Sequence, residues 1–260
     1  MAHVIRASRE PGKAGSGSAA GERAVRPARD KLRTLTIDIG GTGIKMLLID
    51  GQGRPLGARA RSLTPRPSPP DAVLAVIGKM LAEQGKYDRV SVGFPGVVRG
   101  VVQTAPNLGT ETWRGFDIQG AIQQAAGKPT RVVNDADLQG YGVIRGFGVE
   151  LVLTLGTGLG TGLYVNGRLV PNLELAHHPF RMGKTYEQMV SDKELKKVGK
   201  KKWVKRVLDI IDQLEPIFNY DMLHIGGGNA GRLSAPLPPR VRIFDNVEGL
   251  AGGIRLWHET

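Results

Sequence analysis

The sequence predicts an α/β protein with mixed sheets, flanking helices and two similar halves. One observation is a unit that occurs twice, starting at Leu35 and again at Leu151: a β-rich run, a Gly-Thr-Gly turn, a second apolar run and a glycine turn. The other observation is that buried-strand patterns and helical patterns alternate along the rest of the chain. Alternating strands and helices are typical of layered α/β folds, and the repeated unit indicates that the two halves resemble each other.

The first half should consist of short strands, punctuated by glycine and proline, and of helices with one apolar face. In chain order we expect three strands joined by glycine turns (34–63), a proline-rich loop (64–70), a helix (71–84), a buried strand (90–94), a small hairpin (97–104), a helix (118–126), a strand (131–133) and a helix that ends near 145.

The second half repeats this pattern with longer helices. We expect a glycine hairpin (150–170), an irregular segment (171–183), two helices (184–197 and 200–218), a strand (222–225), a last strand (241–244) and a last helix (247–258). The expected division is a tail over 1–33, an N-terminal lobe over 34–135 and a C-terminal lobe over 136–260. The last helix is expected to pack back on the N-terminal lobe.

Composition narrows the class of protein. The chain has 260 residues, no cysteine and a net charge of +12, so disulfides and thiolate metal sites are excluded. No apolar run is long enough to span a bilayer, and no signal peptide is evident, so a cytoplasmic location is expected. Part of the positive charge lies in the tail over 1–33, which is expected to be disordered, and part in a lysine-rich block over 193–206. Either a polyanionic partner or an ordinary solvated face would account for that block.

Polar and glycine-rich segments follow four of the expected strands. They are Asp38 with the loop 40–43, Asn134 with Asp135, the loop 156–162, and the three glycines 226–228. Ligands of α/β folds collect at the carboxyl ends of strands, so these segments predict a cleft between the two halves. Glycine lets backbone N–H groups approach an anion and threonine adds a hydroxyl, so the two loops could hold a phosphate chain from both sides. No Walker-type loop is present.

The carboxylates near these loops admit two interpretations each. Asp38 is either a turn residue or a group that holds Mg²⁺ through water. Asn134 and Asp135 suit a helix N-cap, but Asn134 could cap while Asp135 takes a proton from an attacking alcohol. Asp137 is expected to be a surface or capping residue. Glu174 and His177 are three apart and could bind sugar hydroxyls, although such a pair is more often structural, and His178 could compete with His177.

Taken in order, the segments Asp38 to Lys45, Asn134 to Asp137, Gly156 to Gly160 and Gly226 to Gly228 resemble the ROK family of sugar kinases. The resemblance covers about 34–258 and implies a two-lobed actin-like ATPase (ribonuclease H-like) fold. Within the family, 63–67, 94–98 and 169–177 look most like polyphosphate glucokinases, which phosphorylate the 6-hydroxyl of glucose from polyphosphate and often ATP. Many ROK kinases carry a zinc motif that this chain lacks, and the usual Glu-x-Gly-His is here Glu174-Leu-Ala-His177.

The resemblance assigns a role to each motif residue. Asp135 would be the general base and Asp38 would organise Mg²⁺, with no zinc. The sugar would be bound by Asn134, Glu174, His177 and Glu187. Phosphates would be held by Gly40, Gly41, Thr42, Gly43, Lys45, Gly156, Thr157, Gly158, Gly160 and Thr161. A nucleotide, if one binds, would lie near Gly226, Gly227 and Gly228.

The resemblance also implies a homodimer that binds a sugar and polyphosphate or ATP. The lysine-rich block could form one wall of a groove for polyphosphate. Two other readings of the chain stay open. A sugar-sensing ROK regulator would need a helix-turn-helix, for which 1–33 is too short and too poor in apolar residues, and neither specific nucleic-acid binding nor membrane binding is expected. A sugar-binding pseudokinase would bind glucose without turnover.

Overall fold

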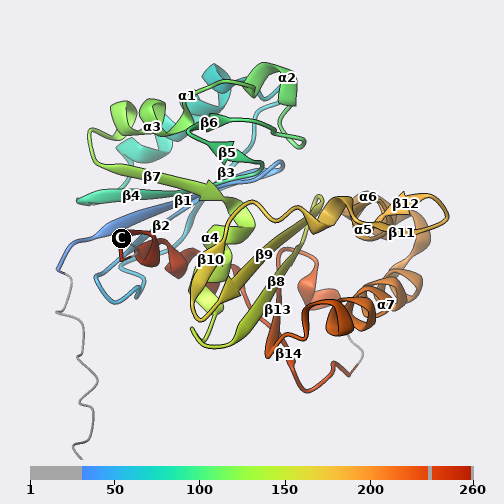
Figure 1. Ribbon diagram of the computed structural model, residues 1–260. Helices are drawn as coiled ribbons and strands as arrows, with labels where there is room; N and C mark the ends of the chain where they lie inside the picture. The colour runs from blue at the N-terminus through green and yellow to red at the C-terminus, as the bar shows by residue number, and fades with distance from the viewer. Residues whose placement is uncertain (1–30, 234–235, 259–260) are drawn as a thin grey trace, which may run out of the picture.

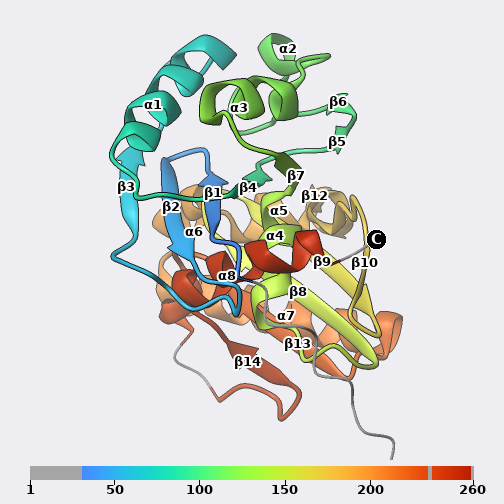
Figure 2. The ribbon, with the colours of Figure 1, turned by 90° about the vertical axis from the view of Figure 1, so that its left-hand side faces the viewer.

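The computed structural model describes residues 31–233 and 236–258. The predicted tail over 1–33 therefore lies, up to residue 30, outside the described residues. The two large sheets are mixed, as predicted, and each has five strands (Figures 1 and 2). The order in the first sheet is β3 (Ala60–Leu63), β2 (Gly43–Ile49), β1 (Thr34–Ile39), β4 (Arg89–Phe94) and β7 (Thr130–Asn134). In the second it is β10 (Arg168–Val170), β9 (Leu159–Val165), β8 (Val149–Leu155), β13 (Met222–Gly226) and β14 (Val241–Ile243).

The two sheets share one topology. In each, three consecutive strands form an antiparallel meander, and two later strands add in parallel beside its first strand. Strands β1 and β4 are buried at every position, because layers of structure cover both faces of the sheet there. A small hairpin, β5 (Val98–Arg99) and β6 (Val101–Val102), follows β4. The repeated sequence unit thus corresponds to a repeated three-stranded meander.

Helices cover both sheets, and one helix lies between them (Figure 1). The first sheet carries α1 (Pro70–Ala82), α2 (Thr110–Trp113) and α3 (Ile118–Ala126), and the second carries α5 (Tyr186–Val190), α6 (Asp192–Val198) and α7 (Lys200–Phe218). The central helix is α4 (Asp135–Val143), whose Leu138 and Tyr141 pack with Val152, Tyr164 and Phe244 of the second sheet and its flank. This position brings the first residues of α4 to the junction of the sheets.

The last helical segment contacts the first sheet. It consists of α8 (Asn246–Ala251) and the 3₁₀ helix η3 (Gly252–Trp257), and Leu250 and Ile254 pack against Leu47 and Ile49 of β2. The Ser91 hydroxyl donates a hydrogen bond of 2.6 Å to the Gly253 carbonyl. A Cβ on Gly252 would lie 2.3 Å from the Gly142 nitrogen of α4, so only glycine allows this approach. The segment over 246–257 therefore packs against the first sheet.

Two local predictions were wrong, and one short helix was not predicted. The helix expected over 184–197 is two helices, α5 and α6, because Ser191 between them is extended, with ψ at 160°. The segment expected to be irregular contains the 3₁₀ helix η1 (Leu175–His177) and strand β11 (Pro179–Arg181), which pairs with β12 (Lys184–Thr185). Helix α2 was not expected, because four residues are too few to show a helical period.

A buried hydrogen bond between a carboxylate and an imidazole joins two of the parallel strands of the second sheet, and burial lowers the pKa of the His224 imidazole. Glu150 on β8 and His224 on β13 lie 2.8 Å apart and are almost inaccessible to solvent. The backbone N–H groups of Arg145 and Gly146 also donate to the Glu150 carboxylate, at 2.8 and 2.7 Å. Burial alone would raise the pKa of Glu150, but these N–H donors and His224 hold it below its ordinary value. The pair ties the turn before β8 to the centre of the sheet.

No helix within the described part of the chain is long and apolar enough to cross a membrane.

Candidate functional site

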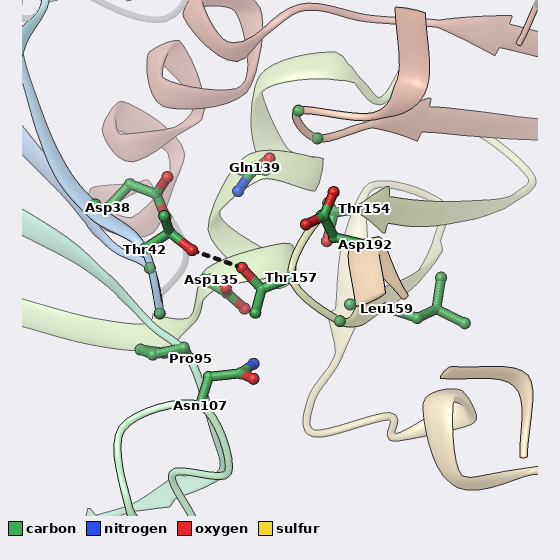
Figure 3. A pocket seen from close by; sticks show the side chains of 18 of the residues that line it. Asp38, Thr42, Pro95, Asn107, Asp135, Gln139, Thr154, Thr157, Leu159 and Asp192 are labelled. Atoms are coloured by element: carbon green, nitrogen blue, oxygen red, sulfur yellow. Dashed lines mark hydrogen bonds between the residues drawn. The ribbon is translucent and has the colours of Figure 1, made fainter. Parts of the chain in front are cut away.

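A pocket of about 420 Å³ lies where the carboxyl ends of the strands of both sheets converge (Figure 3). It is lined by residues that follow β1, β4, β7, β8 and β13, together with residues from β2, β3 and the segment after β10. Most of the predicted site residues share this pocket: Asp38, Gly40, Gly41, Thr42, Gly43, Lys45, Asn134, Asp135, Gly156, Thr157, Gly158, Gly160, Glu174, His177, Glu187, Gly227 and Gly228. The fold thus brings together segments that are far apart in the sequence.

The two glycine-threonine loops face each other across this pocket. The hydroxyl oxygens of Thr42 and Thr157, one from each loop, lie 2.9 Å apart and share a hydrogen bond (Figure 3). Side chains of the first half fix the first loop: the Thr64 hydroxyl donates to the Gly40 carbonyl at 2.5 Å, and Arg66 donates to the Gly41 carbonyl at 2.7 Å. With these carbonyls bound, the loop is held in one shape. Opposed loops with hydroxyl and N–H donors are suited to holding an anion from two sides.

Asp38 ends inside the pocket beside Lys45. The Lys45 ammonium lies 2.6 Å from Oδ2 of Asp38, and the Asp38 side chain is almost fully buried. The other oxygen, Oδ1, is buried and has no hydrogen-bond partner among the described residues. A buried carboxylate oxygen without a partner costs free energy, so this atom has unused capacity to bind a cation or an ordered water.

Asn134 caps helix α4, whereas Asp135 lines the pocket. Asn134 is the N-cap of α4, since its side-chain oxygen accepts from the N–H groups of Ala136 at 2.8 Å and Asp137 at 3.3 Å. Asp135, the first residue of the helix, lines the pocket. Burial raises the pKa of Asp135 to about 8, and the nearby carboxylates of Asp38 and Asp137 add to the rise while Lys45 opposes it. This side chain can accept a proton near neutral pH.

The prediction for Asp137 as a surface or capping residue was wrong. Its side chain is 2% exposed, because α4 is enclosed by both sheets and the face that would meet solvent on an outer helix here meets β9. The Tyr164 hydroxyl donates to its backbone carbonyl. Burial raises the pKa of Asp137 to about 7, Glu174 adds to the rise, and a hydrogen bond from the Asn172 backbone opposes it. Asp137 does not line the pocket and lies behind its wall.

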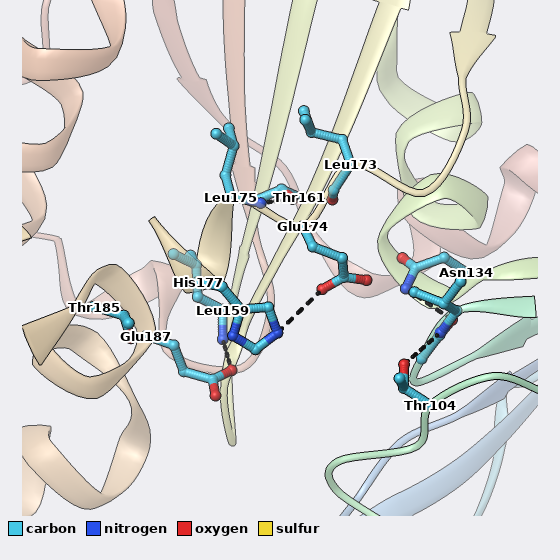
Figure 4. Close-up of polar contacts among 12 residues, drawn as sticks. Thr104, Asn134, Leu159, Thr161, Leu173, Glu174, Leu175, His177, Thr185 and Glu187 are labelled. Carbon is cyan, nitrogen blue, oxygen red and sulfur yellow. Dashed lines mark hydrogen bonds and ion pairs between the residues drawn. The ribbon is translucent and has the colours of Figure 1, made fainter. Parts of the chain in front are cut away.

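The acidic end of the pocket is formed by Glu174, His177 and Glu187 (Figure 4). Nε2 of His177 lies 3.9 Å from Oε2 of Glu174 across the single turn of η1. Oε2 of Glu187 accepts the N–H of Leu159 at 3.0 Å, which ties α5 to the second glycine loop. Burial raises the pKa of Glu174, with His177 opposing the rise and Glu187 adding to it. Carboxylates and imidazole at one end supply the hydrogen-bonding groups that hydroxyl-rich ligands need.

His178 does not compete for this position. Its ring stacks on Tyr186 at 5.0 Å between centroids, its Nδ1 lies 2.7 Å from the Pro179 carbonyl, and it does not line the pocket.

Thr161 and Gly226 are the predicted site residues that do not line the pocket. The Thr161 hydroxyl donates to the Leu173 carbonyl at 2.6 Å and accepts the N–H of Leu175 at 3.3 Å. It therefore holds the segment that carries Glu174 instead of facing an anion. Gly226 lies under Phe244, where a Cβ would approach the ring to 2.1 Å, so this glycine serves packing. Both belong to motifs whose alternate residues point to opposite faces of a strand.

The lysine-rich block lies outside the pocket wall. None of Lys196, Lys197, Lys200, Lys201 and Lys202 lines the pocket. Lys196 instead pairs with Asp192 at 2.6 Å. Asp192 does line the pocket, so the block stands behind an acidic residue, and its predicted place as a groove wall is not supported by this geometry.

Several pocket residues were missed by the sequence reasoning: Arg59, Arg61, Asn107, Gln139, Asp192 and Asn229. Gln139 lies one turn after Asp135 on α4, and its buried Oε1 has no hydrogen-bond partner among the described residues. The spacing of residues in the sequence could have identified Gln139, and also Arg59 with Arg61. A residue four positions after Asp135 shares its helix face, and Arg59 and Arg61 alternate on an expected strand. Asn107 and Asn229 come from turns that carry no such periodic signal.

Comparison with known proteins gives one consistent result. The model of the ROK family matches residues 34–173. A polyphosphate glucokinase of Mycobacterium tuberculosis is 34% identical over 202 residues, which cover 74% of this chain and 76% of that protein. The crystal structure of an inorganic polyphosphate/ATP-glucomannokinase from Arthrobacter sp. strain KM matches with a TM-score of 0.78 at 30% identity, covering 88% of this chain and 100% of that chain.

A more distant structure agrees in fold. A ROK family glucokinase from Streptomyces griseus, in complex with glucose and AMPPNP, matches with a TM-score of 0.72 at 20% identity, covering 86% of this chain and 98% of that chain. The predicted two-lobed actin-like fold and the resemblance drawn from the four motifs are both confirmed. The chain therefore belongs to the ROK family of sugar kinases.

Proposed function

We propose that this protein phosphorylates the 6-hydroxyl of glucose, or of a close hexose, with inorganic polyphosphate or ATP as the phosphoryl donor. The observation that carries the proposal is the position of Asp135. It lines the pocket that also contains the facing Gly-Thr loops, Glu174 and His177, with Glu187 against the second loop. A base in a pocket that has both anion-binding and hydroxyl-binding groups is the arrangement that transfer to an alcohol requires.

In the proposed reaction the sugar oxygen attacks the terminal phosphorus of the donor. Its O–H proton passes to the Asp135 carboxylate, the new O–P bond forms, and the bond from that phosphorus to the bridging oxygen breaks, leaving the shortened donor. The N–H groups and hydroxyls of the loops at 40–43 and 156–158 neutralise charge on the phosphoryl oxygens. Asn134, Glu174, His177 and Glu187 orient the sugar so that the attacking oxygen is in line.

Mg²⁺ fits the donor end of the pocket. It commonly binds through one or two carboxylates, phosphate oxygens and retained waters, and the unpaired, buried Oδ1 of Asp38 offers such a carboxylate. When bound, the ion supplies positive charge to the phosphates. Lys45 holds the other oxygen of Asp38 and so fixes the direction in which Oδ1 points.

A coupled assay for glucose 6-phosphate tests the proposal directly. The protein is incubated with glucose and with ATP, GTP or long-chain polyphosphate at the same Mg²⁺ concentration. Turnover with ATP or polyphosphate is expected. Calorimetric binding of glucose without turnover on any donor would contradict the proposal and favour a sugar-binding protein without kinase activity.

The raised pKa of Asp135 predicts a pH dependence. A general base acts when deprotonated, and the pKa is about 8 in the free protein. Below that pH the active form therefore decreases, and kcat/KM is expected to fall about tenfold for each pH unit, whereas above it the rate levels off. A pH series at saturating Mg²⁺ measures this limb. A value of kcat/KM that stays constant between pH 6 and 8 would contradict the raised pKa of Asp135.

The contacts of Thr161 predict that its replacement raises the KM for glucose and leaves the KM for the donor unchanged. Replacing Thr161 with valine keeps the shape but leaves the Leu173 carbonyl and the Leu175 N–H without their partner. Losing such buried hydrogen bonds costs about 1–3 kcal/mol, so the KM for glucose should rise about fivefold or more. Steady-state kinetics separates the two substrates. A rise in the donor KM with an unchanged glucose KM would restore the original prediction that Thr161 binds phosphate.

A further inference from the structure

A row of charges crosses the first sheet at the pocket. Asp38 on β1 is in register with Lys45 on β2, and Lys45 is in register with Arg61 on β3. All three line the pocket. The Asp38 carboxylate pairs with the Lys45 ammonium at 2.6 Å, so it does not neutralise the charge of Arg61. Like charges directly opposite each other on neighbouring strands destabilise a sheet, and Lys45 and Arg61 are such a pair.

Arg59 extends this row of positive charge outward. It immediately precedes β3 and stands two positions from Arg61. Both are exposed and both line the pocket. Within residues 31–233 and 236–258, neither guanidinium has an acidic or hydrogen-bonding partner. Arg61 lies against the first glycine loop, since a Cβ on Gly43 would be 3.1 Å from its Nε.

Other arginines near this edge are engaged. Arg54 pairs with Asp50 at 2.7 Å, and Arg66 donates to the Gly41 carbonyl at 2.7 Å. Arg59 and Arg61 differ because they face a pocket beside an anion-binding loop. The planar guanidinium fork matches phosphate oxygens, and it stays charged at every physiological pH. The Arg59 and Arg61 guanidinium groups are both unpaired among the described residues and come from positions two residues apart. Two such groups suit an anion with several phosphates better than a single phosphate.

We propose that Arg61 and Arg59 form an outer phosphate subsite that binds the part of a linear polyphosphate that is not transferred. The inference rests on the proposed function, in which the terminal phosphate lies between the two Gly-Thr loops. The rest of the chain then leaves the pocket past Gly43 and over β2 and β3. This route differs from one along the lysine-rich block, whose Lys196 is paired with Asp192 and whose lysines do not line the pocket.

The test compares donors in two matched variants. Arg59→Gln/Arg61→Gln removes two positive charges from the outer subsite, and Lys200→Gln/Lys201→Gln removes two from the exposed start of α7. For each, kcat/KM is measured with long-chain polyphosphate and with ATP. In the arginine variant the ratio of polyphosphate to ATP efficiency should fall at least about tenfold, because each charge-assisted phosphate contact contributes about that much. The lysine variant should keep the parent's ratio.

Two further measurements make the test decisive. The dependence of polyphosphate binding on salt should become shallower in the arginine variant, since fewer phosphate contacts release fewer counterions. Arg59→Lys/Arg61→Lys keeps the charge without the fork and should give an intermediate ratio. An unchanged ratio in the arginine variant would overturn the subsite, as would an equal loss with both donors or a loss in the lysine variant.

The subsite and the proposed function can fail separately. If the parent protein phosphorylates glucose with ATP alone and calorimetry detects no polyphosphate binding, the subsite is wrong and the kinase assignment stands. If no donor gives turnover, titration calorimetry with polyphosphate still tests the subsite. Binding at least about tenfold weaker in the arginine variant than in the lysine variant supports it, and equal binding overturns it. Circular dichroism and thermal unfolding confirm that each variant folds.

Discussion

Replacing Asp135 with asparagine is expected to lower kcat for glucose phosphorylation by about 10²–10⁴-fold, the usual effect of losing a general base. Asparagine keeps the size and polarity of the side chain but cannot take up the proton of the attacking hydroxyl. Asn134 caps α4, so the helix should start as before. Initial rates with saturating glucose and donor measure the effect, and calorimetry should show that glucose still binds.

The matched control is Asp71→Asn. Asp71 is an exposed carboxylate in the first turn of α1 and lies outside the pocket, so its loss should leave kcat unchanged. If Asp135→Asn keeps more than about a tenth of the parent's rate, Asp135 is not the base, because that loss is smaller than any removal of general-base catalysis produces. The pH series described above would then have to be assigned to another group.

Replacing Glu150 with alanine is expected to lower the free energy of unfolding by about 3–5 kcal/mol, because three hydrogen bonds lose their acceptor and each donor left unsatisfied costs about 1–3 kcal/mol. The change leaves His224 and the N–H groups of Arg145 and Gly146 buried without an acceptor. For a chain of this size the midpoint of thermal unfolding should fall by about 6–20 °C. Thermal and urea unfolding followed by circular dichroism measure the change.

Glu111→Ala provides the comparison for Glu150. Glu111 is exposed on α2 and forms a surface pair with Arg114 at 3.6 Å. Exposed pairs contribute at most about 1 kcal/mol, so this variant should unfold close to the parent's midpoint. Equal midpoints for Glu150→Ala and Glu111→Ala would show that the buried pair does not stabilise the second sheet. Glu150→Gln, which keeps an acceptor for one N–H group, should fall between the two.

Local patterns predicted much of the fold. The strand at Arg89–Phe94 and the helix at Ile118–Ala126 were predicted close to their observed bounds, because apolar period and turn residues are properties of neighbouring positions. The break at Ser191 was not predicted. Its extended backbone follows from how α5 and α6 pack beneath the second sheet, and a serine can equally continue a helix.

The motifs in the sequence predicted most of the residues of the site. They did not predict which side chains of each motif face the pocket. Thr157 meets Thr42 across the pocket, whereas Thr161, four residues later, supports the segment with Glu174. Arg59 and Arg61 were overlooked because nothing nearby in the sequence marks them as unpaired. In the part of the chain that the structure describes, the two arginines lack an acidic partner because Asp38, the carboxylate in the same row, pairs with Lys45. Only the register of the three strands reveals this arrangement.

The motifs of the sequence resemble those of the ROK kinases, and the sequence by itself determined that two related halves exist and that each carries a glycine-threonine loop after a strand. Short-range chemistry is sufficient for this, because turn geometry and apolar period act over a few residues. Only the tertiary structure decided that Asp137 is buried and that Asp135 faces the pocket with a raised pKa. Burial and the charges of Asp38, Asp137 and Lys45 come from segments distant in the sequence, and electrostatic interactions depend on separation in space.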